Sequence, residues 1–385
     1  MKELLSKENL EYIARAKEIA DKYVRPIAAE LDKEQKYPWE IIGELQRADL
    51  MGVGIPKEYG GLGAGVLNLC LVIEELSKAC GGVGVAYAVN ALGSFPILLA
   101  GTEEQKRKYL PDIAKGKRLI AFGLSEIEAG SDAGSIKTRA IKEGDHYIIN
   151  GDKKWTTNGG AADIYSIFCV TDPEKGTRGV SAIIVEKGTP GFEIGKAEDK
   201  MGIRCVSVHE LHFKDCCVRT ENLLGGKEGA GFAAAMMTLD RARPGVASQA
   251  VGLAQGAFDL ALDYARKRRQ FNDVIASFQA IQFMLADMAT QIEAARHLVY
   301  TCAQAIDAGV KNISKIASMA KVFASDVAMK VTTDAVQIFG GYGYMRDYPI
   351  EKFMRDAKIT QIYEGTNQIQ RVVIARCLLK EAAGG

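Results

Sequence analysis

The sequence has almost no net charge, because 49 lysines and arginines are balanced by 48 acidic residues, giving +1. Nucleic-acid-binding surfaces normally show a basic excess, so this balance argues against such a partner. No apolar run approaches the roughly 20 residues that a membrane helix needs, so we expect no membrane insertion. The N-terminal residues Met1–Leu4 mix an acid with a base and contain no apolar signal core. We therefore expect a cytoplasmic protein.

Cysteines are also sparse, with eight in 385 residues and no Cys-x-x-Cys spacing. The adjacent pair Cys216 and Cys217 suits the two faces of a strand better than a disulfide. We therefore expect reduced thiols in a reducing compartment. His209 and His212 lie three apart in a predicted strand, so they face opposite sides and no metal site is expected.

The chain is rich in apolar residues (48%) and moderately charged (25%), and its length suits two or three domains. Residues 1–119 show apolar spacings of three and four, which predict about five or six helices. Residues 120–230 alternate with a period of two and contain no intervening helices, so we predict an antiparallel sheet or barrel. Residues 231–385 return to helical patterns rich in small residues. The strongest of these patterns span 245–270, 279–308 and 312–338.

The most informative motif is the segment Tyr363–Arg371, in which Glu364 stands between an aromatic ring and a glycine. Gly365 allows close approach of the backbone to a ligand, because it has no Cβ. Glu364 is able to act as a general base if an apolar pocket tunes its pKa. Taken alone, the motif is equally well explained as a solvated surface charge.

Four other segments each have a binding interpretation and a structural one. Hydroxyls and glycines in Gly123–Asp132 suit a heterocycle or phosphate, or else a polar inter-domain connection. The tryptophan of Lys154–Gly160 suits a flat ligand or a core position. The cations of Arg266–Phe271 suit a phosphate contact by Arg268, or complement a helix dipole. The glycines of Gln337–Tyr344 suit helix caps or close approach of a ligand.

Together these segments resemble the acyl-CoA dehydrogenase family, and the resemblance covers essentially the whole chain. The matching segments occur in the family's order: Gly123–Asp132, Lys154–Gly160, Leu239–Pro244, Arg268–Phe271, Gln337–Gly343 and Tyr363–Arg371. The resemblance implies an α+β fold with an N-terminal helical bundle, a middle antiparallel β-domain and a C-terminal four-helix bundle. It also implies non-covalently bound FAD and dehydrogenation of an acyl-CoA thioester between its alpha and beta carbons.

The resemblance also assigns roles to individual residues. Glu364 matches the catalytic base, whose own N–H and a ribityl hydroxyl of FAD polarise the thioester carbonyl. Ser125, Trp155 and Thr157 match contacts to the flavin ring of FAD. Thr366 and Gln368 match contacts to the pyrophosphate and adenine half of FAD. Positions that match contacts to the FAD of a neighbouring subunit are Arg268, Gln270, Phe271, Gln337 and Gly341. Positions that match the substrate channel are Ser131, Asp240, Arg243, Tyr363 and Gly365. A homo-oligomer, most often a tetramer in this family, is implied by this division.

The resemblance also bears on the substrate and on competing activities. The glutaryl-CoA branch holds a distal carboxylate with an arginine near the start of the segment that corresponds to Val83–Pro96. Here Val83–Asn90 has no cation, so an apolar acyl group (short, branched or alicyclic) is implied. Other branches carry the catalytic acid on the helix of Arg243, where this chain has arginine. The sequence Glu126–Glu128 departs from the family's more usual Glu-Pro, which bears on the shape of that loop.

We expect electrons to pass to an electron-transfer flavoprotein. Three alternatives remain open from the sequence. They are an enoyl-CoA reductase working in the reverse direction, an oxidase that uses oxygen, and a catalytically silent helical interaction module. The module predicts loss of the base or of the flavin contacts, yet these residues are present.

Overall fold

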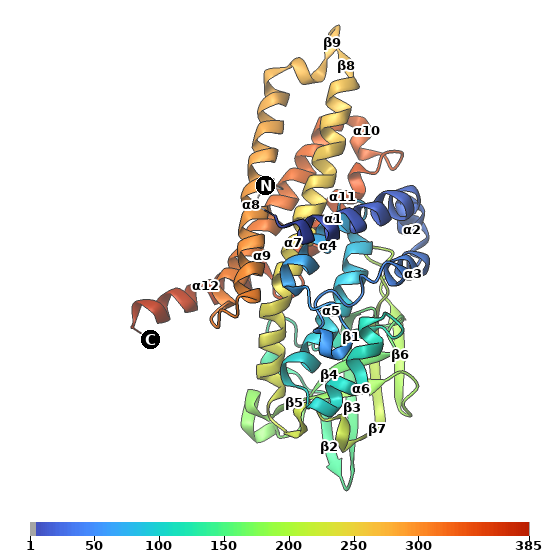
Figure 1. Cartoon of the computed structure of the whole chain (residues 1–385), viewed down its shortest axis with the longest axis vertical. Coiled ribbons are helices and arrows are strands. Elements are labelled where there is room, and N and C mark those ends of the chain that lie inside the picture. The colour runs from blue at the N-terminus through green and yellow to red at the C-terminus, as the bar shows by residue number, and fades with distance from the viewer. Residues whose placement is uncertain (1–4, 385) are drawn as a thin grey trace.

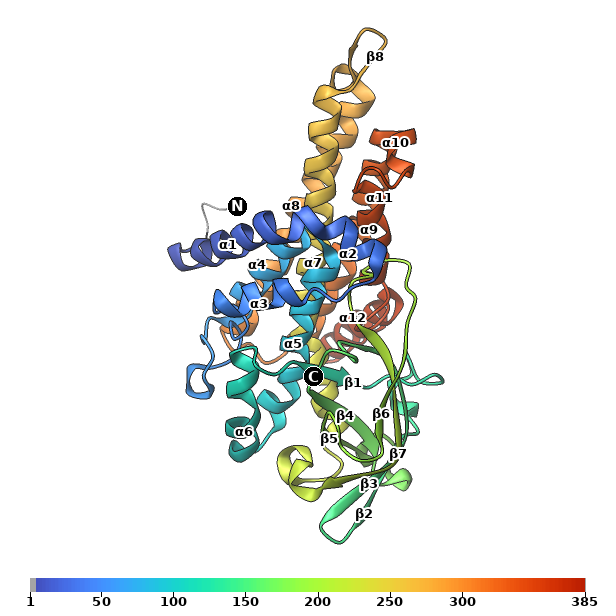
Figure 2. The same cartoon turned by 90° about the vertical axis from the view of Figure 1, so that its right-hand side faces the viewer.

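The computed structural model describes residues 5–384, which form three regions along one long axis (Figure 1). The sheet lies at one end, the long C-terminal helices reach the other end, and the N-terminal helices pack against the middle (Figure 2). The predicted α+β architecture is confirmed, with N-terminal helices, a middle β-domain and a C-terminal helical bundle.

The N-terminal region contains six α-helices within the described residues, in line with the five or six predicted. Ser6 begins the first helix with a capping box, because its hydroxyl accepts from the Asn9 N–H (3.1 Å) and the Asn9 side chain accepts from the Ser6 N–H (3.0 Å). The helices are α1 (Lys7–Ile19), α2 (Ala28–Glu34), α3 (Trp39–Arg47), α4 (Gly65–Ser77), α5 (Gly81–Ala100) and α6 (Glu103–Ala114).

Helix α5 is the apolar core helix of this region. It is long and apolar enough, by length and composition, to cross a membrane, so the expectation that no apolar run approaches that length was wrong. Most of its side chains are buried by protein. The Asn90 side chain accepts from the Ile120 N–H (3.1 Å), and the Ser166 hydroxyl donates to the Gly93 carbonyl (3.1 Å). These bonds fasten α5 to the sheet.

The middle region forms a seven-stranded sheet. Its strands are β1 (Ile120–Gly123), β2 (Arg139–Glu143), β3 (His146–Thr157), β4 (Ile164–Val170), β5 (Val180–Glu186), β6 (Phe192–Ala197) and β7 (Val208–Arg219). The predicted antiparallel pairing holds for β2–β3, β3–β7, β4–β5 and β6–β7. In contrast, β1 and β4 pair in parallel, with Ile120 opposite Ile164. Parallel neighbours need a long connection, and the β2–β3 hairpin lies within it.

The C-terminal region is a bundle in which α7, α8, α9 and α11 pack together. The predicted four-helix bundle is confirmed, and a short hairpin joins α7 to α8 at the far tip of the molecule (Figure 1). The elements are α7 (Gly231–Lys267), β8 (Arg269–Gln270), β9 (Asp273–Val274), α8 (Gln279–Asp307), α9 (Ser314–Phe339), α10 (Gly341–Tyr344), α11 (Ile350–Thr360) and α12 (Asn367–Ala382).

The bundle contacts the N-terminal helices closely, and two features show how. A Cβ at Gly252 of α7 would lie 2.4 Å from the carbonyl oxygen of Glu74, so glycine is required for α7 to approach α4. At the end of α8, the Asp307 carboxylate accepts from the N–H groups of Val66 (2.6 Å) and Leu67 (2.9 Å). This carboxylate caps the N-terminus of α4.

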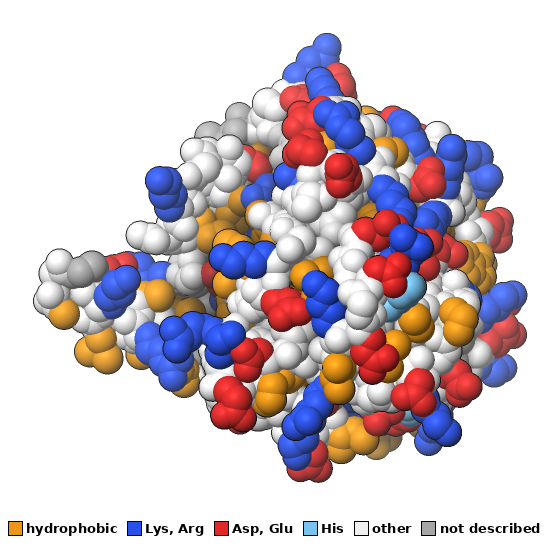
Figure 3. Space-filling view, turned by 90° about the horizontal axis from the view of Figure 1, so that it is seen from below, with side chains coloured by type: hydrophobic (Ala, Val, Ile, Leu, Met, Phe, Trp, Pro, Cys, Tyr) orange, Lys and Arg blue, Asp and Glu red, His pale blue; other side chains and the backbone are white. Residues whose placement is uncertain are grey.

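Two expectations from composition can be compared with the structure. All eight cysteines are free thiols, and Cys216 is buried while Cys217 is exposed, as predicted for adjacent residues of a strand. Seen from below, basic and acidic side chains are interspersed over this face of the molecule (Figure 3), in keeping with the near-zero net charge.

Candidate active site

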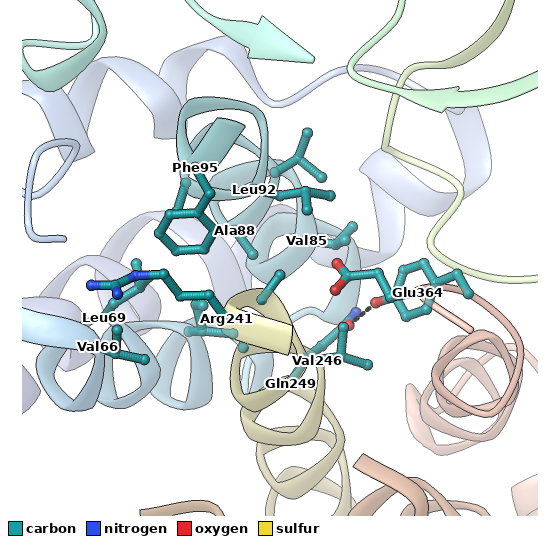
Figure 4. A pocket seen from close by; sticks show the side chains of 16 residues that line it. Val66, Leu69, Val85, Ala88, Leu92, Phe95, Arg241, Val246, Gln249 and Glu364 are labelled. Atoms are coloured by element: carbon teal, nitrogen blue, oxygen red, sulfur yellow. Dashed lines mark hydrogen bonds between the residues drawn. The ribbon is translucent and has the colours of Figure 1, made fainter. Parts of the chain in front are cut away.

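An apolar pocket lies between α4, α5 and α7, and the carboxylate of Glu364 points into it (Figure 4). The walls are aliphatic or aromatic, and polar side chains come from Arg241, Gln249, Tyr363 and Glu364. The wall residues are Val66, Leu69, Ile73, Val85, Ala88, Val89, Ala91, Leu92, Phe95, Ala242, Gly245 and Val246. Such a lining suits a hydrocarbon group placed beside one carboxylate.

Glu364 is electrostatically suited to proton transfer near neutral pH. Burial in the pocket raises its pKa from 4.5 to about 7, although the charges of Arg243 and Lys321 act in the opposite direction. Its Oε2 atom is buried and has no hydrogen-bond partner among residues 5–384. A carboxylate with one free oxygen and a pKa near neutrality has the properties of a general base.

The backbone at this carboxylate has an unusual conformation. Glu364 has φ 52° and Gly365 has φ 92°, so two consecutive residues are in the left-handed region, which costs a non-glycine residue about 1–3 kcal/mol. Hydrogen bonds hold the turn in place. The Gln370 amide donates to the carbonyl oxygens of Glu364 (3.1 Å) and Gly365 (2.9 Å), and the Lys321 ammonium donates to that of Gly365 (2.8 Å).

Lys321 on α9 was not predicted as a site residue. Its side chain is fully buried, and it also donates to Asn367 Oδ1 (2.9 Å). Burial lowers its pKa to about 7, while the charge of Glu364 raises it. One signal was available in the sequence, because Lys321 falls on the apolar stripe of its helix. The neighbouring members of that stripe are Ala317, Ala320, Ala324 and Ala328.

Arg243 and Asp240, predicted at the substrate channel, lie together on α7. The Arg243 guanidinium pairs with the Asp240 carboxylate and donates to the Ser318 hydroxyl (3.2 Å). Arg243 is only 4% exposed, and its charge is close enough to Glu364 to lower the pKa of that carboxyl. Its Nε is buried without a partner among the described residues, so the arrangement retains one free donor near the candidate base.

Tyr363 and Gln249 connect the Glu364 segment to the wall of the pocket. The Tyr363 hydroxyl donates to Gln249 Oε1, and the Gln249 amide donates to the Gly81 carbonyl at the start of α5 (3.1 Å). Gln249 was not predicted from the sequence, since a single glutamine within a long helix has no distinguishing pattern. Its two bonds fix the Glu364 segment against α5 and α7.

Three predicted flavin contacts, Ser125, Trp155 and Thr157, come together beside the end of β3. The Lys154 N–H donates to the Ser125 carbonyl (2.9 Å), which joins their two segments. Trp155 has φ 56° at an irregularity of the β3–β7 pairing and is 54% exposed. An irregularity of this kind redirects a side chain, and an open tryptophan face fits a flat heterocycle.

A buried ion pair supports this loop from beneath. Glu126, the residue after Ser125, pairs with Lys153 (2.7 Å) and accepts from the N–H groups of Lys137 (2.6 Å) and Thr138 (3.0 Å). Ser131, predicted at the substrate channel, is exposed further along the same loop. The unusual Glu126–Glu128 sequence therefore contains a structural anchor.

The second predicted group of FAD contacts lies elsewhere on the chain. Arg268, Gln270 and Phe271 belong to the tip hairpin, and Phe271 is 91% exposed. Gln337 and Gly341 lie at the α9–α10 junction, which Arg268 approaches by placing its guanidinium 5.4 Å from the Tyr342 ring centre. The hairpin is at the top of Figure 1 and β3 is in the lower half. One chain therefore does not bring the two groups together.

Thr366 and Gln368 lie at the start of α12. The Thr366 hydroxyl accepts from the Ile369 N–H (3.2 Å) and so forms the N-cap of this helix, while Gln368 is exposed. Free N–H groups at a helix N-terminus favour an anion, which suits the predicted pyrophosphate contact. The structure thus shows a capping role for Thr366 beside the one expected from resemblance.

Three family models match the chain in order. They describe the acyl-CoA dehydrogenase N-terminal domain (residues 6–117), middle domain (residues 121–216) and C-terminal domain (residues 229–379).

Individual proteins match over nearly the full length. An acryloyl-CoA reductase (NADH) of Anaerotignum propionicum is 48% identical, covering 95% of this chain and 93% of that protein. A chain in a structure of the electron transferring flavoprotein of Acidaminococcus fermentans is 52% identical (97% and 98% covered, TM-score 0.95). The butyryl-CoA dehydrogenase structure of Megasphaera elsdenii is 47% identical (97% and 99% covered, TM-score 0.95).

Proposed function

This chain belongs to the acyl-CoA dehydrogenase family of flavoprotein oxidoreductases, and we propose that Glu364 is the base that removes the alpha proton of a short, apolar acyl-CoA. The single observation that carries this assignment is the unpartnered Oε2 of Glu364 in an apolar pocket. A pKa of about 7 leaves a substantial fraction of the carboxylate ready to accept a proton at neutral pH.

The turn around Glu364 also supplies a donor for the thioester. The main-chain N–H of Glu364 donates to no other group of residues 5–384. In the left-handed turn, this N–H and the carboxylate belong to one residue. The Gln370 amide donates to the carbonyl of that residue, and the Lys321 ammonium donates to the carbonyl of the next residue, Gly365. A fixed N–H stabilises negative charge that develops on a carbonyl oxygen as the alpha proton leaves.

The residues present fit FAD. Ser125, Trp155 and Thr157 would contact the flavin ring, and the start of α12 with Thr366 and Gln368 would face the rest of the cofactor. FAD, when bound, supplies the acceptor for the hydride that leaves the beta carbon. Arg268, Gln270, Phe271, Gln337 and Gly341 would contact the FAD of a second copy, which requires at least a dimer. A homotetramer, the commonest assembly in this family, is the proposed state.

The lining of the pocket supports an apolar acyl group. Apart from Arg241, Gln249, Tyr363 and Glu364, the side chains that line the pocket are aliphatic or aromatic, so they favour hydrocarbon over polar groups. The Megasphaera elsdenii relative acts on butyryl-CoA by its name, which supports a short chain. The Acidaminococcus fermentans match supports an electron-transferring flavoprotein as the acceptor of the electrons.

The reverse reaction is a second candidate, favoured by the likeness to an acryloyl-CoA reductase. The same Glu364 would then donate the alpha proton to an enoyl-CoA, because a group with a pKa of about 7 serves as acid and as base. Comparing flavin reduction by butyryl-CoA with flavin reoxidation by crotonyl-CoA, at matched concentrations, gives the preferred direction.

The assignment is tested by anaerobic mixing of the FAD-loaded protein with butyryl-CoA while the flavin absorbance is followed. Wild type should bleach, whereas Glu364→Gln should bind FAD and butyryl-CoA yet reduce the flavin at least about a thousandfold more slowly. Bleaching at the wild-type rate in Glu364→Gln would reject this base. A protein that cannot be loaded with FAD would reject the function as a whole.

A further inference from the structure

The apolar pocket contains a cation at the end away from Glu364. Arg241 of α7 lines this end, and its side chain extends beside Phe95 and Leu69 (Figure 4). Gln249, which is bound to Tyr363, lies eight residues further along the same helix, so the two ends of the pocket are about 12 Å apart along α7. Val83–Asn90 of α5 contains no cation, so the cation of this pocket comes from α7.

The guanidinium of Arg241 has no ion pair or hydrogen bond with any of residues 5–384. The guanidinium carbon lies 5.6 Å from the centre of the Phe95 ring. Burial lowers the pKa of Arg241, and Asp307 is the one charge that raises it. The oxygens of Asp307 are already bonded to Val66 and Leu67. The guanidinium donors are therefore available to a ligand or to water.

An unpaired guanidinium at the end of an apolar pocket discriminates between acyl chains by the charge at their distal end. A long hydrocarbon tail that reaches it would displace water from the guanidinium and replace none of its hydrogen bonds. A carboxylate at the same place would form charge-assisted hydrogen bonds, in a geometry that guanidinium favours. The same residue thus penalises one class of tail and binds the other.

We propose that Arg241 is a specificity-determining residue, which binds a carboxylate at the distal end of a medium-length acyl chain and rejects an uncharged tail of equal length. The proposal rests on the proposed function, because the thioester must sit at Glu364 for the tail to point toward Arg241. Short apolar groups end before Arg241 and are unaffected by this selection.

The test compares wild type with Arg241→Met, using heptanoyl-CoA and the monothioester pimeloyl-CoA as probes of equal carbon number. Methionine keeps length and apolar contact but removes the charge. We expect the ratio of kcat/KM for pimeloyl-CoA to that for heptanoyl-CoA to fall at least about tenfold in Arg241→Met. Arg107→Met, an exposed arginine of α6 outside the pocket, serves as the matched control and should keep the wild-type ratio.

Two results would overturn the proposal. One is an unchanged ratio, including an equal loss for both thioesters, which would mean that Arg241 only supports the fold. The other is a loss for heptanoyl-CoA that disappears with heptanoyl-pantetheine, which would place the phosphates of CoA at Arg241. Failure of any thioester, butyryl-CoA included, to bleach the flavin of wild type would instead reject the proposed function.

Discussion

The ammonium of Lys321 donates a 2.8 Å hydrogen bond to the carbonyl oxygen of Gly365, the residue directly after the candidate base. The bond joins the buried face of α9 to a left-handed turn that is separated from it by about forty residues of chain. Lys321 also lowers the pKa of Glu364 through its charge. One side chain thus affects both the position and the acidity of the carboxylate.

Replacing Lys321 should therefore change catalysis and its pH dependence together. In wild type, flavin reduction should rise with pH through about 7, because Glu364 must be deprotonated to accept the alpha proton. In Lys321→Met the midpoint should move to higher pH, since a positive charge that favours the carboxylate is removed. Lys330→Met, an exposed change on the same helix, should leave the profile in place. A slower enzyme with an unshifted midpoint would reduce Lys321 to a packing role.

The raised pKa of Glu364 also predicts how stability depends on pH. The folded-state pKa of about 7 is above the ordinary value of 4.5, so the folded protein binds the proton more tightly than the unfolded chain does. Ionisation of Glu364 therefore destabilises the fold as pH rises through this window. Glu364→Gln should resist urea better than wild type at about pH 8, and the advantage should shrink toward pH 4. An advantage that is constant with pH would contradict a titrating Glu364.

Gly365 is predicted to be sensitive to the smallest side chain. Its φ of 92° disfavours any L-residue, and an added Cβ would lie 2.7 Å from the Gln370 amide nitrogen that holds the turn. Gly365→Ala should lower the free energy of unfolding by about 1–3 kcal/mol. It should also lower the rate of flavin reduction. Gly188→Ala is a matched control, with φ 85° and open space around its Cβ. It should lose stability through strain alone, with catalysis retained; equal catalytic loss in both variants would contradict the role of Gln370.

The buried pair of Glu126 and Lys153 should be indispensable to the loop that carries Ser125. Glu126→Ala leaves the Lys153 ammonium, which is fully buried, without its carboxylate. Breaking a buried pair in this way costs about 3–5 kcal/mol, which urea unfolding would measure. FAD affinity should fall as well, because Ser125 adjoins the lost anchor. Asp21→Ala instead removes two exposed pairs, with Lys17 and Arg25, and should cost less than about 1 kcal/mol. Comparable losses in the two variants would refute the anchor.

Local sequence patterns predicted much of this architecture. Alternation with a period of two placed the sheet within residues 120–230, and its seven strands, from Ile120 to Arg219, lie in that range. The parallel pairing of Ile120 with Ile164 was missed, since the local sequence of a strand does not determine which distant strand it pairs with. The apolar character of α5 was underestimated, because Asn90 and Pro96 interrupt the run in the sequence but not the helix in the structure.

The residues of the candidate site also divide into those that the sequence predicted and those that it did not. Glu364, Gly365 and Tyr363 were found because they are adjacent in sequence and form a motif. Lys321, Gln249 and Arg241 each stand alone on a long helix, and their importance arises only when tertiary packing brings them to the pocket. Residues of this kind carry no local pattern beyond a polar side chain on an apolar stripe.

The separation of Trp155 from the tip hairpin, seen within one chain in Figure 1, has a consequence for the life of the protein in a cell. When the residues around Trp155 and those of the tip hairpin contact the same cofactor, a single newly made chain provides only part of the binding site. Flavin retention then becomes a matter of mass action: chains that are scarce or diluted release their cofactor, and abundant chains keep it. The flavin absorbance per chain in a preparation would therefore measure the fraction of chains that have assembled.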